Sequence, residues 1–191
     1  RVWDVAAGAA ARPAVDGHEH NVTTLARVGD GRRVVTASED ATLRVWDVVE
    51  GGAPLKLVGH EDEVNAGECY GGGDTRRAVS GGCDTTLLVW DLDKGGAPLL
   101  KLEGHEEAVR AIACHGEGDV RRAVSGGLDK TLFVWDLVKG RKLRKLEGHT
   151  ERVLAIACHG EGDARRAVSG GDELLVWDLD KGGAPLLKLE R

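Results

Sequence analysis

Methionine is absent from this 191-residue sequence, and phenylalanine and tyrosine occur once each. Because a natural full-length product starts with methionine, we expect an internal piece of a longer protein. Positive charge is also scarce, since 26 Lys and Arg against 32 Asp and Glu give a formal charge of −6, which disfavours a dedicated nucleic-acid binder. The sequence has neither an apolar run long enough to span a bilayer nor a signal segment. We therefore predict a soluble, intracellular protein of the cytoplasm, with the nucleus as the alternative.

Cysteine is sparse, and no CxxC pair is present to suggest zinc. The four thiols are Cys69, Cys83, Cys114 and Cys158, and we expect them to be reduced, with no metal and no cofactor. Cys69, Cys114 and Cys158 share one position of the repeat described below, which favours small buried thiols. Glycine is abundant, with 28 residues against 4 prolines. Without a collagen period, this favours tight turns between short strands, and hence an all-β fold.

An internal repeat organises the whole chain. Every tryptophan precedes an aspartate, and the spacings between them are 43, 44, 45 and 42 residues. These tryptophans are Trp3, Trp46, Trp90, Trp135 and Trp177. Gly-His pairs recur in the same phase, at His18, His60, His105 and His149. Longer identities point to duplication, because the thirteen residues Asp91–Glu103 recur unchanged as Asp178–Glu190.

A period of this length, with Gly-His near one end and Trp-Asp near the other, resembles the WD40 repeat over the entire chain. The resemblance implies an all-β, WD40-type β-propeller of four four-stranded blades plus a leading half blade, in an incomplete ring. The blades are expected at 1–18 (a partial blade with the outer strands), 19–60, 61–105, 106–149 and 150–191 (with a shortened hairpin).

Within the unit 61–105, short apolar runs bounded by turn residues predict four strands. They are expected near Val64–Cys69, Arg77–Ser80, Thr86–Trp90 and Leu99–Leu102. The third run is apolar on both alternating faces, so neighbouring blades must cover both sides of the sheet. The first blade lacks its inner strands and no Gly-His follows the last one. We expect a piece of a larger ring of around seven blades, with association of two copies or five-fold closure as alternatives.

Four polar residue types recur at fixed spacing and resemble the structural hydrogen-bonded tetrad of the family. The sets are His18, Thr36, Asp40, Trp46; His60, Ser80, Asp84, Trp90; His105, Ser125, Asp129, Trp135; and His149, Ser169, Asp172, Trp177. The last hairpin is two residues shorter, so Asp172 either still reaches His149 or leaves that tetrad incomplete. Ser, His and Asp together are also the catalytic residues of many hydrolases. Because this set recurs in every blade, we interpret it as structural. We predict no catalytic residues and no enzyme activity.

Paired arginines recur where each second strand begins. They are Arg32-Arg33, Arg76-Arg77, Arg121-Arg122 and Arg165-Arg166. A ring of such pairs could bind phosphates or acidic peptides. Since Asp74, Asp119 and Asp163 lie beside them, local ion pairing is the favoured interpretation.

The resemblance implies a platform for protein or peptide partners, which would contact residues that vary while the framework repeats. The candidate contact residues are Asn21, Thr23, Glu39, Glu63, Asn65, Cys83, Ala108, Arg110, Leu128, Arg152 and Leu154. Arg110 and Arg152 would be the charged anchors. We predict a non-catalytic scaffold or adaptor. The alternatives are the recognition domain of a larger enzyme or signalling protein with its catalytic part outside these residues, and, more weakly, phosphate or nucleic-acid binding through the arginine pairs.

Overall fold

The computed structural model describes residues 16–29, 31–71, 75–116, 121–160 and 165–189. These residues form sixteen strands and no helix, so no helix in the described ranges could cross a membrane. The expected strands of residues 1–15 lie outside the described residues.

The strands form four antiparallel sheets, each with its four strands in chain order. The first sheet holds β1 (Val22–Arg27), β2 (Arg33–Ser38), β3 (Thr42–Asp47) and β4 (Leu55–Val58). The second holds β5 (Val64–Tyr70), β6 (Arg77–Gly82), β7 (Leu87–Asp91) and β8 (Leu100–Leu102). The third holds β9 (Val109–His115), β10 (Arg122–Gly127), β11 (Thr131–Asp136) and β12 (Arg141–Glu147). The fourth holds β13 (Ala155–His159), β14 (Arg166–Gly170), β15 (Leu174–Asp178) and β16 (Leu187–Leu189).

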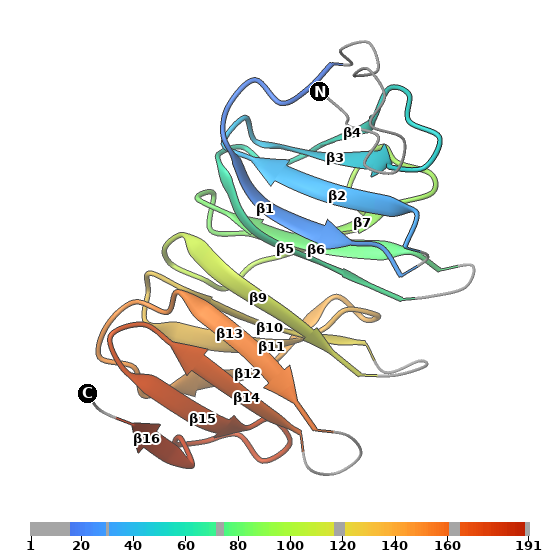
Figure 1. Ribbon diagram of the computed structural model, residues 1–191. Helices are drawn as coiled ribbons and strands as arrows, with labels where there is room; N and C mark the ends of the chain where they lie inside the picture. The colour runs from blue at the N-terminus through green and yellow to red at the C-terminus, as the bar shows by residue number, and fades with distance from the viewer. Residues whose placement is uncertain (1–15, 30, 72–74, 117–120, 161–164, 190–191) are drawn as a thin grey trace.

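The sheets stack face to face in chain order, and their first strands lie side by side along the inside of the arc (Figure 1). The first sheet, drawn in blue, and the last, drawn in red, stand at opposite ends and do not meet (Figure 1). This open, all-β arc of four four-stranded blades confirms the predicted fold class.

In each of the four sheets, the aspartate of the Trp-Asp pair closes the turn between the third and fourth strands. In the second sheet, one carboxylate oxygen of Asp91 accepts the backbone N–H groups of Asp93 and Lys94, both at 3.0 Å. The carbonyl of Asp91 accepts the N–H of Gly95, whose φ of 65° glycine adopts without strain. The same turn recurs in the other three sheets. The recurrence of Asp after Trp therefore has a local cause.

Apolar side chains fill each boundary between sheets, where the tryptophan of the later sheet packs on the earlier one. Trp90 packs against the face of the first sheet that carries Val35 and Leu43. Trp135 and Trp177 repeat this contact on the second and third sheets. All three indoles are 1% exposed. Burial of this size is the main stabilising contribution to the stack.

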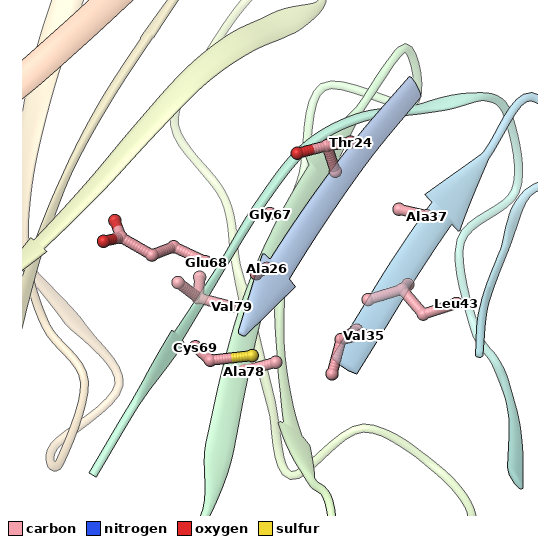
Figure 2. Close-up of a pocket in the computed structure, with 10 residues that line it drawn as sticks. All are labelled: Thr24, Ala26, Val35, Ala37, Leu43, Gly67, Glu68, Cys69, Ala78 and Val79. Carbon is pink, nitrogen blue, oxygen red and sulfur yellow. The ribbon is translucent and has the colours of Figure 1, made fainter. Parts of the chain in front are cut away.

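Small and large residues compensate for one another across the boundaries. At the second boundary, Gly81 of β6 packs against the large Ile112 of β9. At the first boundary, the equivalent residues are Ala37 of β2 and Gly67 of β5, so the larger residue is on the other sheet. Figure 2 shows Gly67 and Ala37 on the two sides of a gap between the sheets. The gap has a volume of about 10 Å³, room for one water molecule at most.

The outer face of the fourth sheet has no cover within the described part of the chain. Leu174 and Leu189 pair across β15 and β16, and they are 39% and 51% exposed. The corresponding Leu132 and Leu146 of the third sheet are both 0% exposed because the fourth sheet lies on them. The arc therefore ends in the same kind of apolar face that its internal boundaries bury.

Candidate functional site

Side chains recurring in each sheet form a chain of hydrogen bonds from its edge to its core. In the second sheet, His60 Nδ1 lies 2.8 Å from Asp84 Oδ2, and Nε2 lies 2.7 Å from Ser80 Oγ. The indole N–H of Trp90 donates to the same Ser80 Oγ at 2.8 Å. An imidazole protonated on Nδ1 satisfies this network, because it donates to the carboxylate while Nε2 accepts the serine hydroxyl proton. The sets of the first and third sheets have the same connections.

The tetrad aspartates are held as anions. Burial by itself raises the pKa of the Asp84 carboxyl, but hydrogen bonds from His60 and from the backbone N–H groups of Glu61 and Thr86 outweigh it and lower the pKa to about 2. Asp129 has a pKa of about 2 for the same reasons. These bonds also fix the turn that leads into the third strand.

The serines of these sets cannot act as nucleophiles toward a substrate. Ser80, Ser125 and Ser169 are all 0% exposed, and each accepts an indole N–H. A catalytic serine has to reach the scissile bond. The arrangement supplies buried polar anchoring to the sheets.

In the fourth sheet, Glu173 occupies the place predicted for Asp172. Its Oε1 accepts the backbone N–H of Thr150 at 2.7 Å and lies 3.4 Å from His149 Nδ1, while Asp172 is exposed. Since the hairpin is two residues shorter, the acidic group sits at the start of β15, and the longer glutamate side chain bridges the distance. At 3.4 Å, His149 Nδ1 has no well-formed hydrogen bond with a described residue. The assignment of Asp172 to this tetrad is therefore wrong, while His149, Ser169 and Trp177 remain connected.

Replacing Glu173 with glutamine is expected to lower the urea midpoint of unfolding at pH 7. The hydrogen bond from Lys188 and the backbone N–H of Thr150 lower the pKa of Glu173 to about 2, against an ordinary 4.5. A depressed carboxyl pKa contributes stability above pH 4.5, and this contribution disappears as the pH falls toward 2. The difference between wild type and Glu173→Gln should therefore vanish over this interval. The matched variant Asp172→Asn should change the midpoint little. If Asp172→Asn lowers the midpoint as much as Glu173→Gln does, the assignment of Glu173 instead of Asp172 to this tetrad is contradicted.

The arginine pairs form ion pairs on the rim of the arc. Arg32 pairs with Asp47 at 2.7 Å and also with Glu50. Arg77 pairs with Asp91 at 3.0 Å within its own sheet. The predicted partners Asp74, Asp119 and Asp163 lie outside the described residues. The ion pairs of Arg32 and Arg77 are made with acidic residues at the end of the third strand or in the turn after it.

Cysteines at one repeat position pack against the apolar clusters between the sheets: Cys69, Cys114 and Cys158. Burial, with the nearby Glu68 carboxylate, raises the pKa of Cys69 and of Cys158 to about 12, and it raises that of Cys114 well above its ordinary value. All four cysteines are free thiols of intermediate exposure. No group of three or more potential ligands for a metal ion occurs among the described residues. Burial also lowers the pKa of His115, with Arg122 and Arg165 adding to the effect, to about 4.

The eleven variable residues lie around the edge of the arc that carries the tetrad histidines. We call this side the histidine edge. It includes the connections 59–63, 103–108 and 148–154 and the turns 39–41, 83–86, 128–130 and 171–173. Asn21 donates to Glu39 at 2.9 Å in the first sheet. Ala108 and Leu128 face each other through a backbone hydrogen bond of 3.0 Å. Thr23 donates its hydroxyl proton to the carbonyl of Val64 on the next sheet. Leu154 is 47% exposed.

Four variable residues of the second and third sheets form a connected cluster. Arg110 donates to Asn65 Oδ1 at 2.9 Å, and the Asn65 amide donates to Cys83 Sγ at 3.2 Å. Cys83 Sγ in turn lies 3.9 Å from Glu63 Oε2. Arg152 is exposed on the following sheet. The structure thus brings Glu63, Asn65, Cys83 and Arg110 together, and leaves Arg152 apart from them.

Comparison with known proteins agrees with this geometry. A family model described as WD domain, G-beta repeat matches residues 13–47 and 96–136. The first match ends on Trp46-Asp47, and the second spans the tetrad of the third sheet from His105 to Trp135. No curated protein matches the chain. Together with four sheets of one design and three complete tetrads, these matches support a WD40-repeat family for the chain.

Proposed function

We propose that this chain is a non-catalytic scaffold that binds protein or peptide partners on its histidine edge. WD40 repeats generally mediate interactions between proteins. The observation that supports the proposal here is the cluster around Arg110, which joins variable residues of two adjacent sheets above an unvarying framework. An exposed arginine held by an asparagine is preorganised to receive a partner's carboxylate or carbonyl group.

Arg110 and Arg152 are two exposed cationic side chains of this surface. Arg110 follows the buried Val109 by one position, and Arg152 precedes the buried Val153 by one position. The two arginines therefore stand two positions apart in the repeat, on consecutive sheets. Arginine is enriched among residues that dominate binding energy. We expect a partner whose contact segment offers acceptor groups to both.

Replacing both arginines with alanine is expected to reduce partner capture about tenfold, the loss of one good hot-spot contact. The whole chain, biotinylated at its N-terminus, would be incubated with cell extract, and retained proteins quantified by mass spectrometry. The matched control carries Lys139→Ala and Arg141→Ala, two exposed residues at the opposite end of the third sheet, and removes the same charge. Proteins retained by wild type and control but lost from the double variant would then be titrated individually. Equal retention by all three chains would overturn the assignment of the surface.

A further inference from the structure

Opposite the histidine edge, an aspartate joins the first sheet to the second. There, one oxygen of Asp93 receives Arg33 of the first sheet at 3.0 Å and Arg76 of the second at 3.1 Å. Arg33 also donates to the backbone carbonyl of Leu92 at 3.1 Å. We call this side of the arc, formed by the arginine pairs and the turns 48–54, 92–99, 137–140 and 179–186, the arginine edge.

The boundary between the third and fourth sheets is built the same way. Asp180 stands where Asp93 stands, and its Oδ1 lies 3.4 Å from both Arg122 of the third sheet and Arg165 of the fourth. At both boundaries, one carboxylate thus bridges two guanidinium groups from different sheets. Charge-assisted bridges of this kind are directional and favour a carboxylate over a neutral group.

The boundary between the second and third sheets has both arginines but lacks the carboxylate. The turns read Asp-Leu-Asp-Lys at 91–94 and 178–181, and Asp-Leu-Val-Lys at 136–139. Val138 therefore occupies the bridging position between Arg77 and Arg121. Among the described residues Arg121 forms no ion pair, and its guanidinium lies 6.0 Å from the centre of the Tyr70 ring.

Arg77 adopts the conformation of an arginine that has nothing to bridge to. Its Nη1 lies 3.0 Å from Asp91 of its own sheet and 3.1 Å from the carbonyl of Arg76. Arg166, on the uncovered face of the fourth sheet, folds back in the same way onto Asp178 at 3.1 Å and onto the preceding carbonyl at 3.1 Å. The missing carboxylate thus has a visible consequence for the neighbouring side chain.

A cavity of about 300 Å³ opens at this boundary. Arg77 and Arg121 are the charged residues that line it. The other lining residues are mostly apolar: Tyr70, Thr75, Val89, Leu99, Leu100, Leu137 and Val138. Val138 and Leu99 are 60% and 50% exposed. The cavity thus places exposed apolar side chains beside two guanidinium groups, a lining that suits a ligand with both an acidic and an apolar group.

We propose that this cavity binds a peptide segment of another protein in which an aspartate or glutamate is flanked by an aliphatic residue. The carboxylate takes the place that Asp93 and Asp180 hold at the flanking boundaries, between Arg77 and Arg121. The aliphatic side chain packs against Leu99 and Val138. The ligand class follows from the flanking boundaries, because each fills the same position with a carboxylate that directly follows a leucine. This site lies at the opposite ends of the strands from the histidine edge. The test of this site is therefore independent of the test of the surface proposed above.

The probe for this site is the fluorescein-labelled, C-terminally amidated peptide Gly-Ser-Leu-Asp-Leu-Ser-Gly, which carries a single carboxylate on the peptide portion. Its binding to the whole chain would be followed by fluorescence anisotropy at constant salt. A second peptide with asparagine in place of the aspartate keeps the shape and removes the charge. We expect the aspartate peptide to bind saturably, and the asparagine peptide to bind at least about tenfold more weakly, as for the loss of a charge-assisted hydrogen bond.

Two substitutions separate a specific site from general charge effects. Val138→Asp supplies the missing carboxylate from within the chain, so it should weaken binding of the aspartate peptide at least about tenfold by occupying the arginines. Val49→Asp is the matched control, since Val49 has the same place in the turn of the first sheet and the same exposure of 60%. It adds equal charge away from the cavity and should leave the affinity unchanged.

Urea unfolding of the same variants provides a readout that needs no ligand. If the two arginines converge on the position of Val138, Val138→Asp should unfold at a higher urea concentration than Val49→Asp. Should Val138→Asp fail to fold, Arg121→Gln takes its place in the binding assay, with the same expected loss of affinity. The proposal is overturned if wild type shows no saturable binding, if the asparagine peptide binds equally well, or if Val138→Asp behaves like Val49→Asp in binding.

Discussion

Replacing Trp90 with alanine is expected to lower the free energy of unfolding by about 3–5 kcal/mol, the range for large-to-small substitutions of buried aromatic residues. The indole is 1% exposed and packs between the first and second sheets. Its N–H also donates to Ser80 Oγ at 2.8 Å, so the substitution removes a hydrogen bond inside the core as well as volume. Equilibrium urea denaturation followed by far-ultraviolet circular dichroism measures the change.

Trp46→Ala provides the matched control for this substitution. Trp46 donates to Thr36 Oγ1 at the same 2.8 Å, but its indole is only half-buried on the outer face of the first sheet. The same atoms are therefore removed from a less enclosed site, and the loss of stability should be clearly smaller. A loss under about 1 kcal/mol for Trp90→Ala would contradict the tight packing of the first boundary. Equal losses for both variants would mean that both faces of the first sheet are equally enclosed.

Most of the strand arrangement could be predicted from the sequence, because turn residues and apolar runs repeat at one period. The runs expected at Val64–Cys69 and Arg77–Ser80 became β5 and β6, which extend one and two residues further. The tetrad side chains of the first three sheets also lie in contact, since their spacing places each on a defined strand or turn. Contacts within one sheet can therefore be predicted from the spacing of residues along the chain.

Contacts between sheets were beyond such patterns. Arg33 and Asp93 lie sixty residues apart, and only the stacking of the sheets brings them within 3.0 Å. The difference between Asp93 and Val138 is visible in the sequence, but its meaning depends on which arginines face that position. Glu173 was missed for a related reason, because a hairpin shortened by two residues moves the acidic group along the chain and selects a longer side chain. The sequence did signal a change at this turn, through the two-residue deletion. Asp172 was selected only because the other three sets contain an aspartate.

Replacing Gly126 with alanine is expected to lower the free energy of unfolding by about 1–3 kcal/mol, the usual result of overpacking a filled core. A Cβ at this position of β10 would lie 2.6 Å from Val153 Cγ1 and 3.0 Å from Ile156 Cδ1 of the fourth sheet. Val153 is 0% exposed and cannot move aside without disturbing its neighbours. The loss would appear as a lower urea midpoint with an unchanged slope.

Gly170→Ala makes the same change at the equivalent position of β14, where nothing lies within 4 Å of the added atom. Because alanine restricts the unfolded chain more than glycine does, this variant should be neutral or more stable by up to about 1 kcal/mol. The pair therefore measures whether the outer face of the fourth sheet, with Leu174 and Leu187 at its surface, is covered in solution. If Gly170→Ala costs as much as Gly126→Ala, that face is packed against a further surface. A cost that grows with protein concentration would identify that surface as a second copy of the chain, because only association between copies depends on concentration in this way.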